Sequence, residues 1–401
     1  MSSEIVVTGL GFVSAWGCTE AAVRHALEAD VDGGRVLAPE DSRLADRLDP
    51  APVPAGIRAG WVRDFDPRQA IDAGRLRRMD FAARMLVTAC RSALADACLL
   101  NRDVVAGDRI GLSIGSMLGN QRETEVFLDR VLDRGAAAGQ PFLFPNLVLN
   151  AAAGQAAIQF GLTGPCLAVS LEEASGEAAL AAGLDLLDAG RCDVVVAGGM
   201  DEISRSVLKL LAVRGLVAKD AADKRGPGKS HRGTLLPGEG AACLVLERRD
   251  SALQRQVRPR ARLVSAATHG IAATPWDFGN PKAIADVFEA GAKTLSRLAL
   301  IIGGSRAVDP RRMAETLLLE RISNACGAPP PLIRPRERYG EFGSCGALDV
   351  ALACLVVSGR HLPGSAGGTP LRMPRDRVLV TGCGRSGAVV PVLVEGIGGE
   401  S

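Results

Sequence analysis

Two adjacent glutamates, Glu172 and Glu173, lie in the segment GPCLAVSLEEASG (164–176), which predicts a turn between a strand and a buried helix. The strand is expected at Leu167–Ser170 and the helix at Glu177–Ala189, which consists almost wholly of Ala, Leu and Gly. Such a turn holds a side chain at the helix N-terminus, where free N–H groups and the helix dipole favour an anion. A cysteine there would gain thiolate character, whereas a glutamate is only a stabilised, poorly nucleophilic carboxylate. The segment therefore has the geometry of a nucleophile site but lacks the nucleophile.

Other motifs offer little chemistry. GCGRSG (382–387) has the spacing of a dinucleotide-binding loop, but such a loop needs a helix after it, and the residues from Ala388 onward predict a strand. No Walker lysine pattern is present. The four histidines are far apart and none has a neighbouring Cys, Asp or His at ligand spacing, which argues against a metal site and against a Cys-His or Ser-His pair.

The elements that would position these residues alternate between strand and helix, as in an α/β protein. In residues 1–250 we expect strands at Glu4–Gly9, Arg109–Ser116, Leu167–Ser170, Asp193–Gly198 and Ala242–Leu246, and helices at Glu20–Ala29, Phe81–Ala97, Gln121–Arg134 and Glu177–Ala189. In residues 251–401 we expect strands at Ala261–Ala266 and Leu300–Gly303, helices at Ala283–Leu298, Arg311–Asn324 and Gly346–Val357, and a hairpin over Arg377–Glu395. The charged stretch Arg249–Arg260 is the candidate boundary, and GEGAACLVLE (238–247) and GRSGAVVPVLVE (384–395) suggest that the halves are similar.

Composition narrows the class of protein. The 401 residues are 47% hydrophobic and carry a formal net charge of only +2, with basic and acidic residues intermixed, so neither a nucleic acid nor a membrane surface is an expected partner. Residues 135–171 contain no charge, but their prolines and asparagines favour a protein interior or subunit interface over a membrane span. The ten cysteines form no CxxC pair, predicting reduced core thiols and a cytoplasmic location.

Five segments, in order, resemble the β-ketoacyl synthase family of the thiolase fold. They are VVTGLGFVSAWG, GLSIGS, PNLVLNAAAGQAAIQFGLTGP, GLDLLDAGRCDVVVAGGMDE and GEGAACLVLE. The resemblance covers nearly the full chain and implies two similar βαβαβαββ halves, 1–250 and 251–401, in a five-layered αβαβα arrangement.

The groups that give active members of this family their chemistry are missing. The family pattern places its cysteine at Glu173, and the turns that carry its two histidines read LIIGGSRAVD (300–309) and PRERYGEFGSCGALD (335–349), without histidine. The family's lysine is replaced by Pro335 or Arg336, depending on the alignment. Losing all of these groups removes covalent loading and oxyanion handling alike. The degenerate active-site residues implied by the resemblance are Glu172, Glu173, Gly303, Arg306, Gly340, Cys383 and Arg385.

The pattern resembles the chain-length factor, the cysteine-lacking partner subunit of type II polyketide synthases. That resemblance implies a heterodimer with a Cys-containing ketosynthase, no bound cofactor or metal, and a phosphopantetheine-linked acyl carrier protein that acts through the partner. The chain would shape the tunnel for a growing polyketide or polyene acyl chain. The candidate tunnel residues are Met117, Leu118, Thr124, Phe127, Leu128 and Val131, although a stripe of this kind is equally typical of ordinary core packing.

Several alternatives stay open from the sequence. Glu173 is either an inert anion at a helix N-terminus or the partner of a cation such as Arg306 or Arg385, and we favour the pair because an unpaired buried carboxylate is costly. The chain could instead be a self-sufficient acyltransferase that uses Ser175 or Cys166 as its nucleophile. A third hypothesis is a non-catalytic scaffold that binds carrier proteins.

Overall fold

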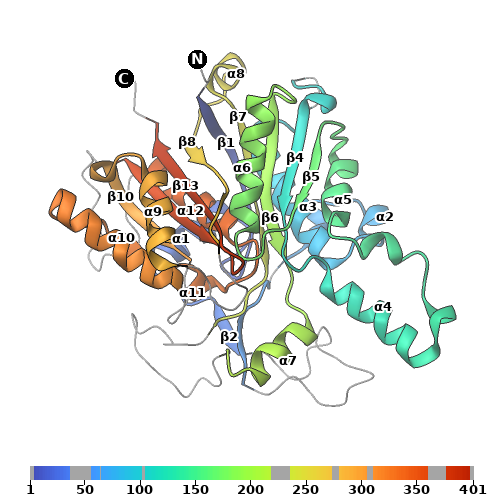
Figure 1. Ribbon diagram of the computed structural model, residues 1–401. Helices are drawn as coiled ribbons and strands as arrows, with labels where there is room; N and C mark the ends of the chain where they lie inside the picture. The colour runs from blue at the N-terminus through green and yellow to red at the C-terminus, as the bar shows by residue number, and fades with distance from the viewer. Residues whose placement is uncertain are drawn as a thin grey trace.

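The computed structural model describes residues 4–36, 56–63, 65–101, 104–217, 235–272, 280–304, 310–359 and 376–397. Its strands are β1 (Ile5–Val13), β2 (Gly34–Val36), β3 (Arg58–Gly60), β4 (Ile110–Gly115), β5 (Cys166–Val169), β6 (Val194–Asp201), β7 (Gly240–Arg248), β8 (Ala261–Ala266), β9 (His269–Gly270), β10 (Leu298–Gly303), β11 (Leu332–Ile333), β12 (Arg377–Cys383) and β13 (Ala388–Gly396). Its helices are α1 (Glu20–Glu28), α2 (Ala73–Leu76), α3 (Phe81–Asp96), α4 (Gln121–Arg134), α5 (Ala151–Phe160), α6 (Ser175–Asp188), α7 (Arg205–Val213), α8 (Arg249–Gln254), α9 (Pro281–Ala292), α10 (Pro310–Cys326), α11 (Arg336–Tyr339) and α12 (Gly346–Gly359). Figure 1 shows these elements, with both chain ends on the same side of the molecule.

The large sheet consists of two halves with the same strand order. The first half runs β5-β4-β6-β7-β1 and the second runs β11-β10-β12-β13-β8. In each half the first two strand pairs are parallel and the last two are antiparallel. The halves meet where β1 pairs with β8 over only two residues, Val6↔Arg262 and Val7↔Ala261. Because β7 and β13 hold the same place in the two halves, the short match between their sequences reflects a structural repeat.

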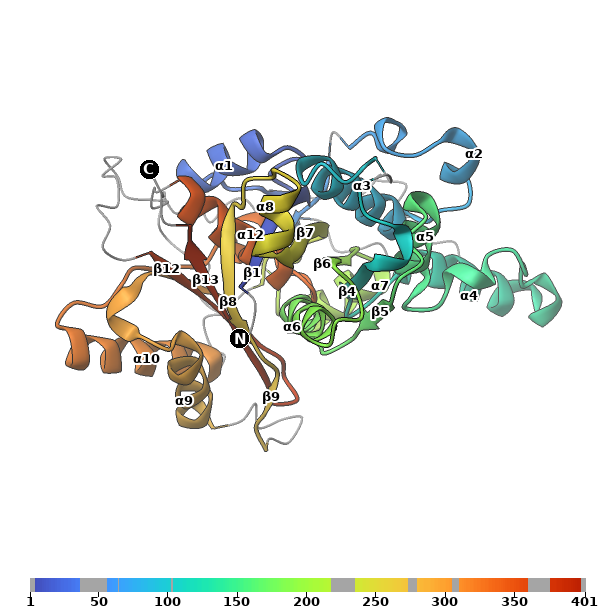
Figure 2. The same ribbon diagram turned by 90° about the horizontal axis from the view of Figure 1, so that it is seen from above.

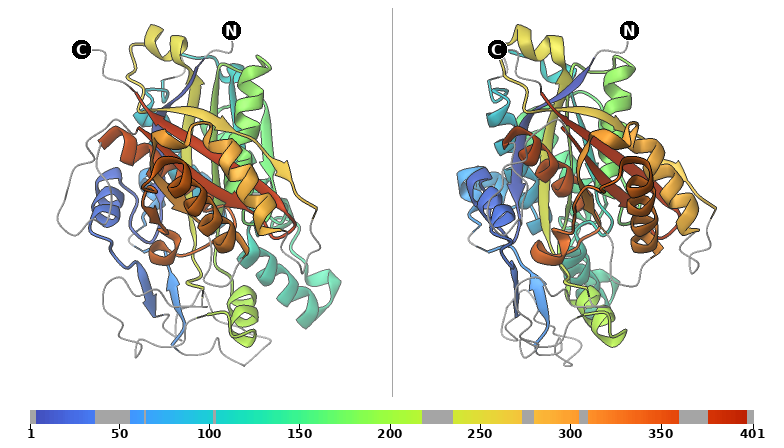
Figure 3. Two further views of the ribbon diagram at one scale, coloured as in Figure 1. Left: turned by 60° about the vertical axis from the view of Figure 1, so that its left-hand side comes forward. Right: turned by 90° about the vertical axis from the view of Figure 1, so that its left-hand side faces the viewer.

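Helices cover and separate the two half-sheets. The helices α6 and α12 contact each other and strands of both halves, so they form the middle layer (Figure 2). The helices α3 and α5 cover the outer face of the first half, while α9 and α10 pack together outside the second half (Figure 3). The result is the five-layered thiolase fold expected from the resemblance. All residues of α12 from Gly346 to Val357 are buried, as a helix that lies between two sheets requires.

Local sequence explains how the outer layer packs. Asp80 caps α3 by accepting a hydrogen bond from Ala83 N at 2.6 Å. Its carboxylate thereby satisfies one of the free N–H groups of the first turn. Strand β1 then presses against α3 at Gly9 and Gly11, where an added Cβ would lie 2.1 Å from Ala93 O and 1.9 Å from Ala89 O. The glycines of GLGFVSAWG therefore serve close packing between strand and helix.

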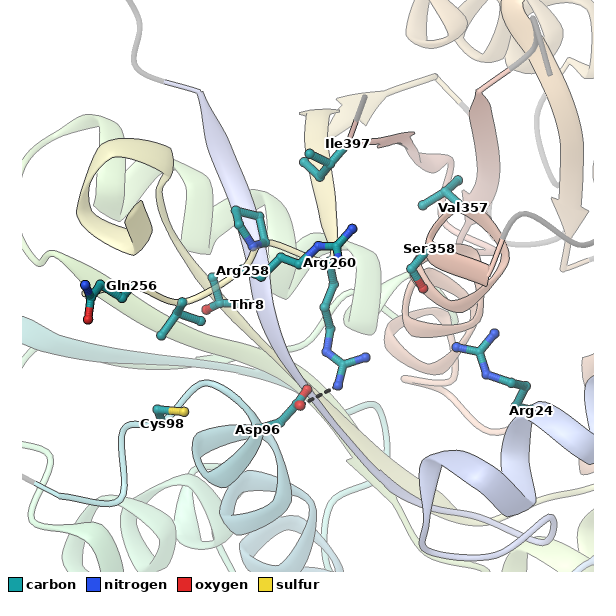
Figure 4. Close-up of a pocket in the computed structure, with 12 residues that line it drawn as sticks. Thr8, Arg24, Asp96, Cys98, Gln256, Arg258, Arg260, Val357, Ser358 and Ile397 are labelled. Carbon is teal, nitrogen blue, oxygen red and sulfur yellow. Dashed lines mark hydrogen bonds and ion pairs between the residues drawn. The ribbon is translucent and has the colours of Figure 1, made fainter. Parts of the chain in front are cut away.

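A pocket of about 560 Å³ lies at the end of the sheet near the chain termini (Figure 4). Two of the arginines that line it are occupied by structural ion pairs. Arg24 pairs with Glu20, and Arg260 pairs with both Glu20 and Asp96. These contacts tie α1, α3 and the start of β8 together, so we assign Arg24 and Arg260 a structural role.

Some elements differ from the sequence expectation. The helix expected at Ala283–Leu298 ends at Ala292, because the chain passes through a 3-10 turn and begins β10 at Leu298. The helices α5, α7 and α8 were not predicted, and α8 lies inside the charged stretch taken as a boundary. The expectation of core thiols is wrong for Cys98 and Cys166, which are exposed. In the described part of the chain, no helix is both long and apolar enough to span a bilayer.

Candidate functional site: a filled condensing-enzyme site

The turn between β5 and α6 is held by the hydroxyl group of Ser175. Ser175 Oγ accepts a hydrogen bond from Leu171 N at 2.9 Å and donates one to Glu172 O at 2.6 Å. Within this turn Glu172 has a φ of +50°, a left-handed conformation that is uncommon for a residue other than glycine. The strand–turn–helix predicted from the sequence is thus present, and its backbone is sharply bent at the paired glutamates.

The carboxylate of Glu173 forms an ion pair with Arg385. Arg385 Nε lies 2.6 Å from Glu173 Oε1, and the Glu173 residue is only 3% exposed. The expected pairing with Arg385 is confirmed, whereas Arg306, the other candidate, lies outside the described residues. Neither oxygen of Glu173 accepts a hydrogen bond of good geometry in the described part of the chain, so we find no support for a carboxylate held only by the helix N-terminus.

The turn between β12 and β13, which carries Arg385, also engages the other glutamate. Ser386 N donates to Glu172 Oε2 at 2.6 Å. A Cβ added at Gly384 would lie 3.1 Å from Leu171 O. The segment GCGRSG therefore packs against the turn of the two glutamates, and a strand follows it as predicted, so it offers no helix N-terminus to a phosphate.

A buried carboxylate occupies the space beside the first degenerate turn. Gly303 ends β10, and an added Cβ would lie 2.8 Å from the carboxylate of Glu315. Glu315 is 1% exposed, accepts a hydrogen bond from Thr381 Oγ1 at 2.7 Å and pairs with Arg334 at 2.8 Å. Hydrogen bonds and charge thus satisfy this acid within the protein core.

A buried arginine occupies the second degenerate turn. Arg336 is 3% exposed and reaches Glu177 at 2.8 Å and Asp349 at 2.6 Å. Tyr339 OH donates to the other oxygen of Asp349 at 2.9 Å. Burial raises the pKa of Asp349 from 3.8 to about 6, and the nearby guanidinium opposes that shift. Of the two residues that could replace the family's lysine, Arg336 is the one whose charge enters the site.

The two turns come together through Arg336. A Cβ at Gly304 would lie 2.7 Å from its guanidinium group, and Cβ atoms at Gly346 and Gly382 would lie 1.8 and 2.8 Å from the carboxyl carbon of its partner Glu177. Gly340 has a φ of +100° and packs against the backbone of Gly238. Charged side chains therefore fill the region that these two turns enclose.

The remaining predicted residue of this group is Cys383, the last residue of β12. It is buried, and its carbonyl oxygen accepts a hydrogen bond from Arg311 Nη1 at 2.6 Å. This position is therefore part of the core beneath the β12–β13 turn.

The tunnel candidates fall into two groups. Met117 and Leu118 lie after β4 in a loop organised by the buried carboxylate of Asp201, which accepts hydrogen bonds from Ser116 Oγ at 2.8 Å and from backbone N–H groups of this loop. The other oxygen of Asp201 accepts from Ser344 N at 2.8 Å, which joins this loop to the start of α12. Sequence reasoning missed Asp201, although an acid that closes an apolar strand is a signal that could have identified it.

The second group of candidates lies on α4, where none of the residues is buried. Leu128 is 49% exposed, and Thr124, Phe127 and Val131 are half-buried. The ring of Phe127 packs edge-on against Phe144, with centroids 6.4 Å apart. The stripe is therefore not part of the buried core of this chain.

The two alternative nucleophiles are poorly suited to attack. Ser175 is fully buried and its hydroxyl group is engaged in the turn at both its donor and its acceptor side. Cys166 starts β5, at the far end of this strand from the glutamates. Although the residue is exposed as a whole, partial desolvation of its thiol raises its pKa. Neither side chain is prepared for covalent catalysis.

A family model described as "Beta-ketoacyl synthase, N-terminal domain" matches residues 2–252. The chain belongs to the β-ketoacyl synthase family. A 3-oxoacyl-[acyl-carrier-protein] synthase 2 of Coxiella burnetii is 28% identical over 271 residues, which cover 67% of this chain and 63% of the relative. The synthase of the same name from Staphylococcus aureus strain N315 is also 28% identical, over 272 residues. The matched region thus spans less than two thirds of the length of these relatives.

Solved structures of the family match the fold over the whole chain. "The ishigamide ketosynthase/chain length factor" has a TM-score of 0.85 at 22% identity and covers 99% of this chain and 100% of the matched one. A β-ketoacyl synthase from Burkholderia phymatum STM815 has a TM-score of 0.83 at 19% identity, with 99% and 100% covered. A type II PKS acyl-carrier protein in complex with its ketosynthase bound to the hexaketide gives a TM-score of 0.80 at 17% identity and covers 99% and 100%. At these identities the matches show the fold.

Proposed function

We propose that this chain is a catalytically silent chain-length factor that pairs with a Cys-containing ketosynthase and shapes the tunnel for its growing polyketide or polyene chain. The observation that carries the proposal is the ion pair between Glu173 and Arg385 at the position of the family's nucleophile. The buried acid Glu315 and the buried arginine Arg336, next to the turns that lack histidine, also support the proposal. A site filled in this manner can hold structure but cannot load an acyl group.

An exposed apolar surface supports the pairing. The strand β5 lies at the edge of the sheet, and three of its four residues are exposed. The helix α5 packs against β5, and α4, α5 and the segment between them carry further exposed large apolar side chains, which are Val126, Leu128, Leu132, Phe142, Phe144, Val148, Leu149 and Ile158. A free edge strand beside so many apolar side chains is typical of a surface that another chain covers. We call it the β5 surface.

We assign this surface to a Cys-containing ketosynthase of the same fold. A chain without its own nucleophile can take part in condensation only next to a subunit that has one. The structural matches include a ketosynthase/chain length factor and a type II ketosynthase in complex with its acyl-carrier protein. On this proposal, the phosphopantetheine-linked acyl carrier protein delivers its cargo to the partner's cysteine, and this chain binds no cofactor.

The decisive experiment expresses the chain alone and together with a Cys-containing ketosynthase, preferably one encoded next to it. We expect a 1:1 complex by mass measurement, with acyl groups from a carrier protein found only on the ketosynthase. Leu167→Lys in β5 should dissociate the complex, whereas Leu253→Lys, at a more exposed leucine on α8, should leave it intact. Acylation or condensation by the lone chain would overturn the proposal and favour the acyltransferase with an unusual nucleophile.

Product length provides a second test. Leu128→Phe adds bulk on α4 and should shorten the products of the complex if the tunnel passes this helix. Leu253→Phe is the matched control and should leave the product distribution unchanged. If the complex assembles with Leu128→Phe but yields the same products, that result would argue against a tunnel along α4. If no substitution in this chain changes the product length, the scaffold that binds carrier proteins would be favoured.

A further inference from the structure

A cavity of about 650 Å³ lies between the start of α3, the start of α4 and the segment around Asn146. It is distinct from the filled site, since none of the ion-paired residues of that site lines it. Its lining consists of four arginines, three acids, two amides and six apolar residues, which are Arg77, Arg78, Arg84, Arg122, Asp80, Glu123, Glu202, Asn146, Gln155, Met79, Phe81, Val126, Phe142, Leu143 and Pro145.

Two of the acids are already occupied by structural contacts. Glu202 is 1% exposed and accepts from Arg122 N at 2.8 Å and from Arg122 Nε at 3.1 Å. Asp80 caps α3 through the hydrogen bond that its Oδ1 accepts from Ala83 N, while its Oδ2 is buried without a hydrogen-bond partner among the described residues. The third acid, Glu123, has a pKa that burial raises. The four arginines of the lining outnumber its three acids, so the formal charge of the cavity is positive.

The arginines retain donors without acceptors. In the described part of the chain, no acid lies within ion-pairing distance of Arg77, Arg78 or Arg84, and Arg84 Nη2 donates only to Leu76 O, at 3.0 Å. Arg84 Nε and Arg122 Nη2 are buried and have no hydrogen-bond acceptor among the described residues. Buried guanidinium N–H groups without acceptors are unfavourable, and an oxygen ligand would relieve them.

The rest of the cavity suits a hydrocarbon chain. Met79, Phe81, Leu143 and Pro145 contribute apolar walls, and the ring of Phe81 lies 4.2 Å from the Arg122 guanidinium. Val126 and Phe142 line the cavity and also belong to the β5 surface, where they are 42% and 70% exposed. The cavity therefore opens where the proposed partner would bind, with apolar walls and a cationic lining.

We propose that this cavity binds the distal end of an acyl chain carried by the partner subunit, and that this end bears a carboxylate. The proposal rests on the proposed function, because the chain must arrive from a ketosynthase seated on the β5 surface. Arg84 and Arg122 bind the carboxylate oxygens, and the apolar walls bind the methylene groups next to it. Charge-assisted hydrogen bonds of this kind select against a chain that ends in a methyl group.

The test compares two acyl groups of equal length on the intact complex. Thioesters of nonanedioic acid and of nonanoic acid are offered to the partner's cysteine, and the rates of its acylation are measured by mass spectrometry. We expect about a tenfold preference for the carboxylate-ended group, lost in Arg84→Met and partly retained in Arg84→Lys. Arg91→Met, on the exposed side of the same helix, should keep the full preference. Equal rates for both groups, or a preference that survives Arg84→Met, would overturn the inference.

A second measurement separates this inference from the proposed function. The chain alone is titrated by calorimetry with nonanedioate and with nonane-1,9-diol, at equal ionic strength. Binding of the diacid but not of the diol, lost in Arg84→Met, supports the cavity even if no complex forms with a ketosynthase. A complex that forms while the lone chain binds neither probe, and loads both thioesters equally, overturns the inference and leaves the chain-length factor standing.

Discussion

Arg385 Nε lies 2.6 Å from the carboxylate of Glu173, at the position where active members of the family hold their cysteine. The glutamate is 3% exposed while the arginine side chain is 37% exposed, so one partner is buried and the other reaches solvent. The ion pair joins the β5–α6 turn to the β12–β13 turn, and thereby the two halves of the fold. At this position the chain thus has a structural contact between the halves.

Arg385→Met should therefore destabilise the chain by about 1–3 kcal/mol, less than for a fully buried pair because Arg385 is partly solvated. The cause is the buried Glu173 carboxylate that loses its cation. Glu173→Gln should cost less and should cancel most of the effect of Arg385→Met in the double variant. Urea unfolding of the four proteins measures this. Arg68→Met, whose partner Asp66 is exposed, is the control and should leave the stability almost unchanged.

Restoring the nucleophile should not restore the reaction. A Glu173→Cys variant places a thiol beside Arg385, which favours the thiolate, so we expect alkylation by iodoacetamide. Decarboxylation of a malonyl thioester should stay at background, because the two turns of the second half supply no histidine and Arg336 already binds Glu177 and Asp349. Alkylation is followed by mass spectrometry and decarboxylation by carbon dioxide release. Decarboxylation above that of unsubstituted protein would show that the second half still supplies the missing groups.

The buried triad around Arg336 should dominate the stability of the middle layer. Arg336→Met leaves the acids Glu177 and Asp349 buried without a cation and should cost about 3–5 kcal/mol. Arg338→Met, two residues along the chain and paired with the exposed Asp30, should cost less than about 1 kcal/mol. Thermal unfolding by circular dichroism distinguishes the two. Equal effects would mean that Arg336 acts through packing of its methylene groups rather than through charge.

The sequence predicted the alternation of strands and helices, and the absence of the family's cysteine, for clear physical reasons. Apolar strands such as β6, and helices of Ala and Leu such as α6, carry strong local signals of burial. The sequence also offered Arg385, beside Arg306, as a candidate cation for Glu173, because a buried carboxylate needs a partner. Both inferences rest on the residue types themselves.

The contacts between the charged side chains that fill the degenerate site could not be predicted in the same way. Glu177 lies in an apolar helix and Asp349 in another, and each was a visible anomaly, but their common partner Arg336 is more than 150 residues from Glu177 in sequence. The network exists only after the two half-sheets enclose the middle layer. The exposure of α4 was likewise invisible, because an apolar stripe has the same spacing whether its own core or another chain covers it.

The conformation of the loop that carries Met117 and Leu118 should depend on the carboxylate oxygen Oδ1 of Asp201. In Asp201→Asn the amide oxygen replaces only one carboxylate oxygen, and the amide N–H group in the other place faces an N–H donor such as Ser344 N, so at least one hydrogen bond would be lost. We expect a cost of about 2–4 kcal/mol and, in the complex, a change in product length if the loop shapes the tunnel. Denaturant unfolding and product analysis measure the two effects. A stability loss without any change in products would confine the role of Asp201 to folding.

Stability should fall as the pH rises from 6.5 to 8, and Glu202 should account for much of the change. Burial raises its pKa from 4.5 to about 8, opposed by Arg122, so the folded chain keeps a proton that the unfolded chain releases. Stability contributed by such a group falls as the pH rises through this range, by up to about 1.4 kcal/mol per pH unit. Asp80 and Asp349, whose pKa values burial raises to about 6, act mainly below this window.

The measurement is urea unfolding at pH 6.5, 7.2 and 8. Glu202→Gln cannot ionise and should show a flatter dependence of the free energy of unfolding on pH, because its protonation no longer differs between the folded and unfolded states. Glu289→Gln removes a carboxylate that is 41% exposed and pairs with Arg321 on the surface, and it should keep the slope of the unsubstituted protein. An unchanged slope in Glu202→Gln would mean that Arg122 holds Glu202 ionised in the fold, and the cavity beside α4 would then contain one more negative charge.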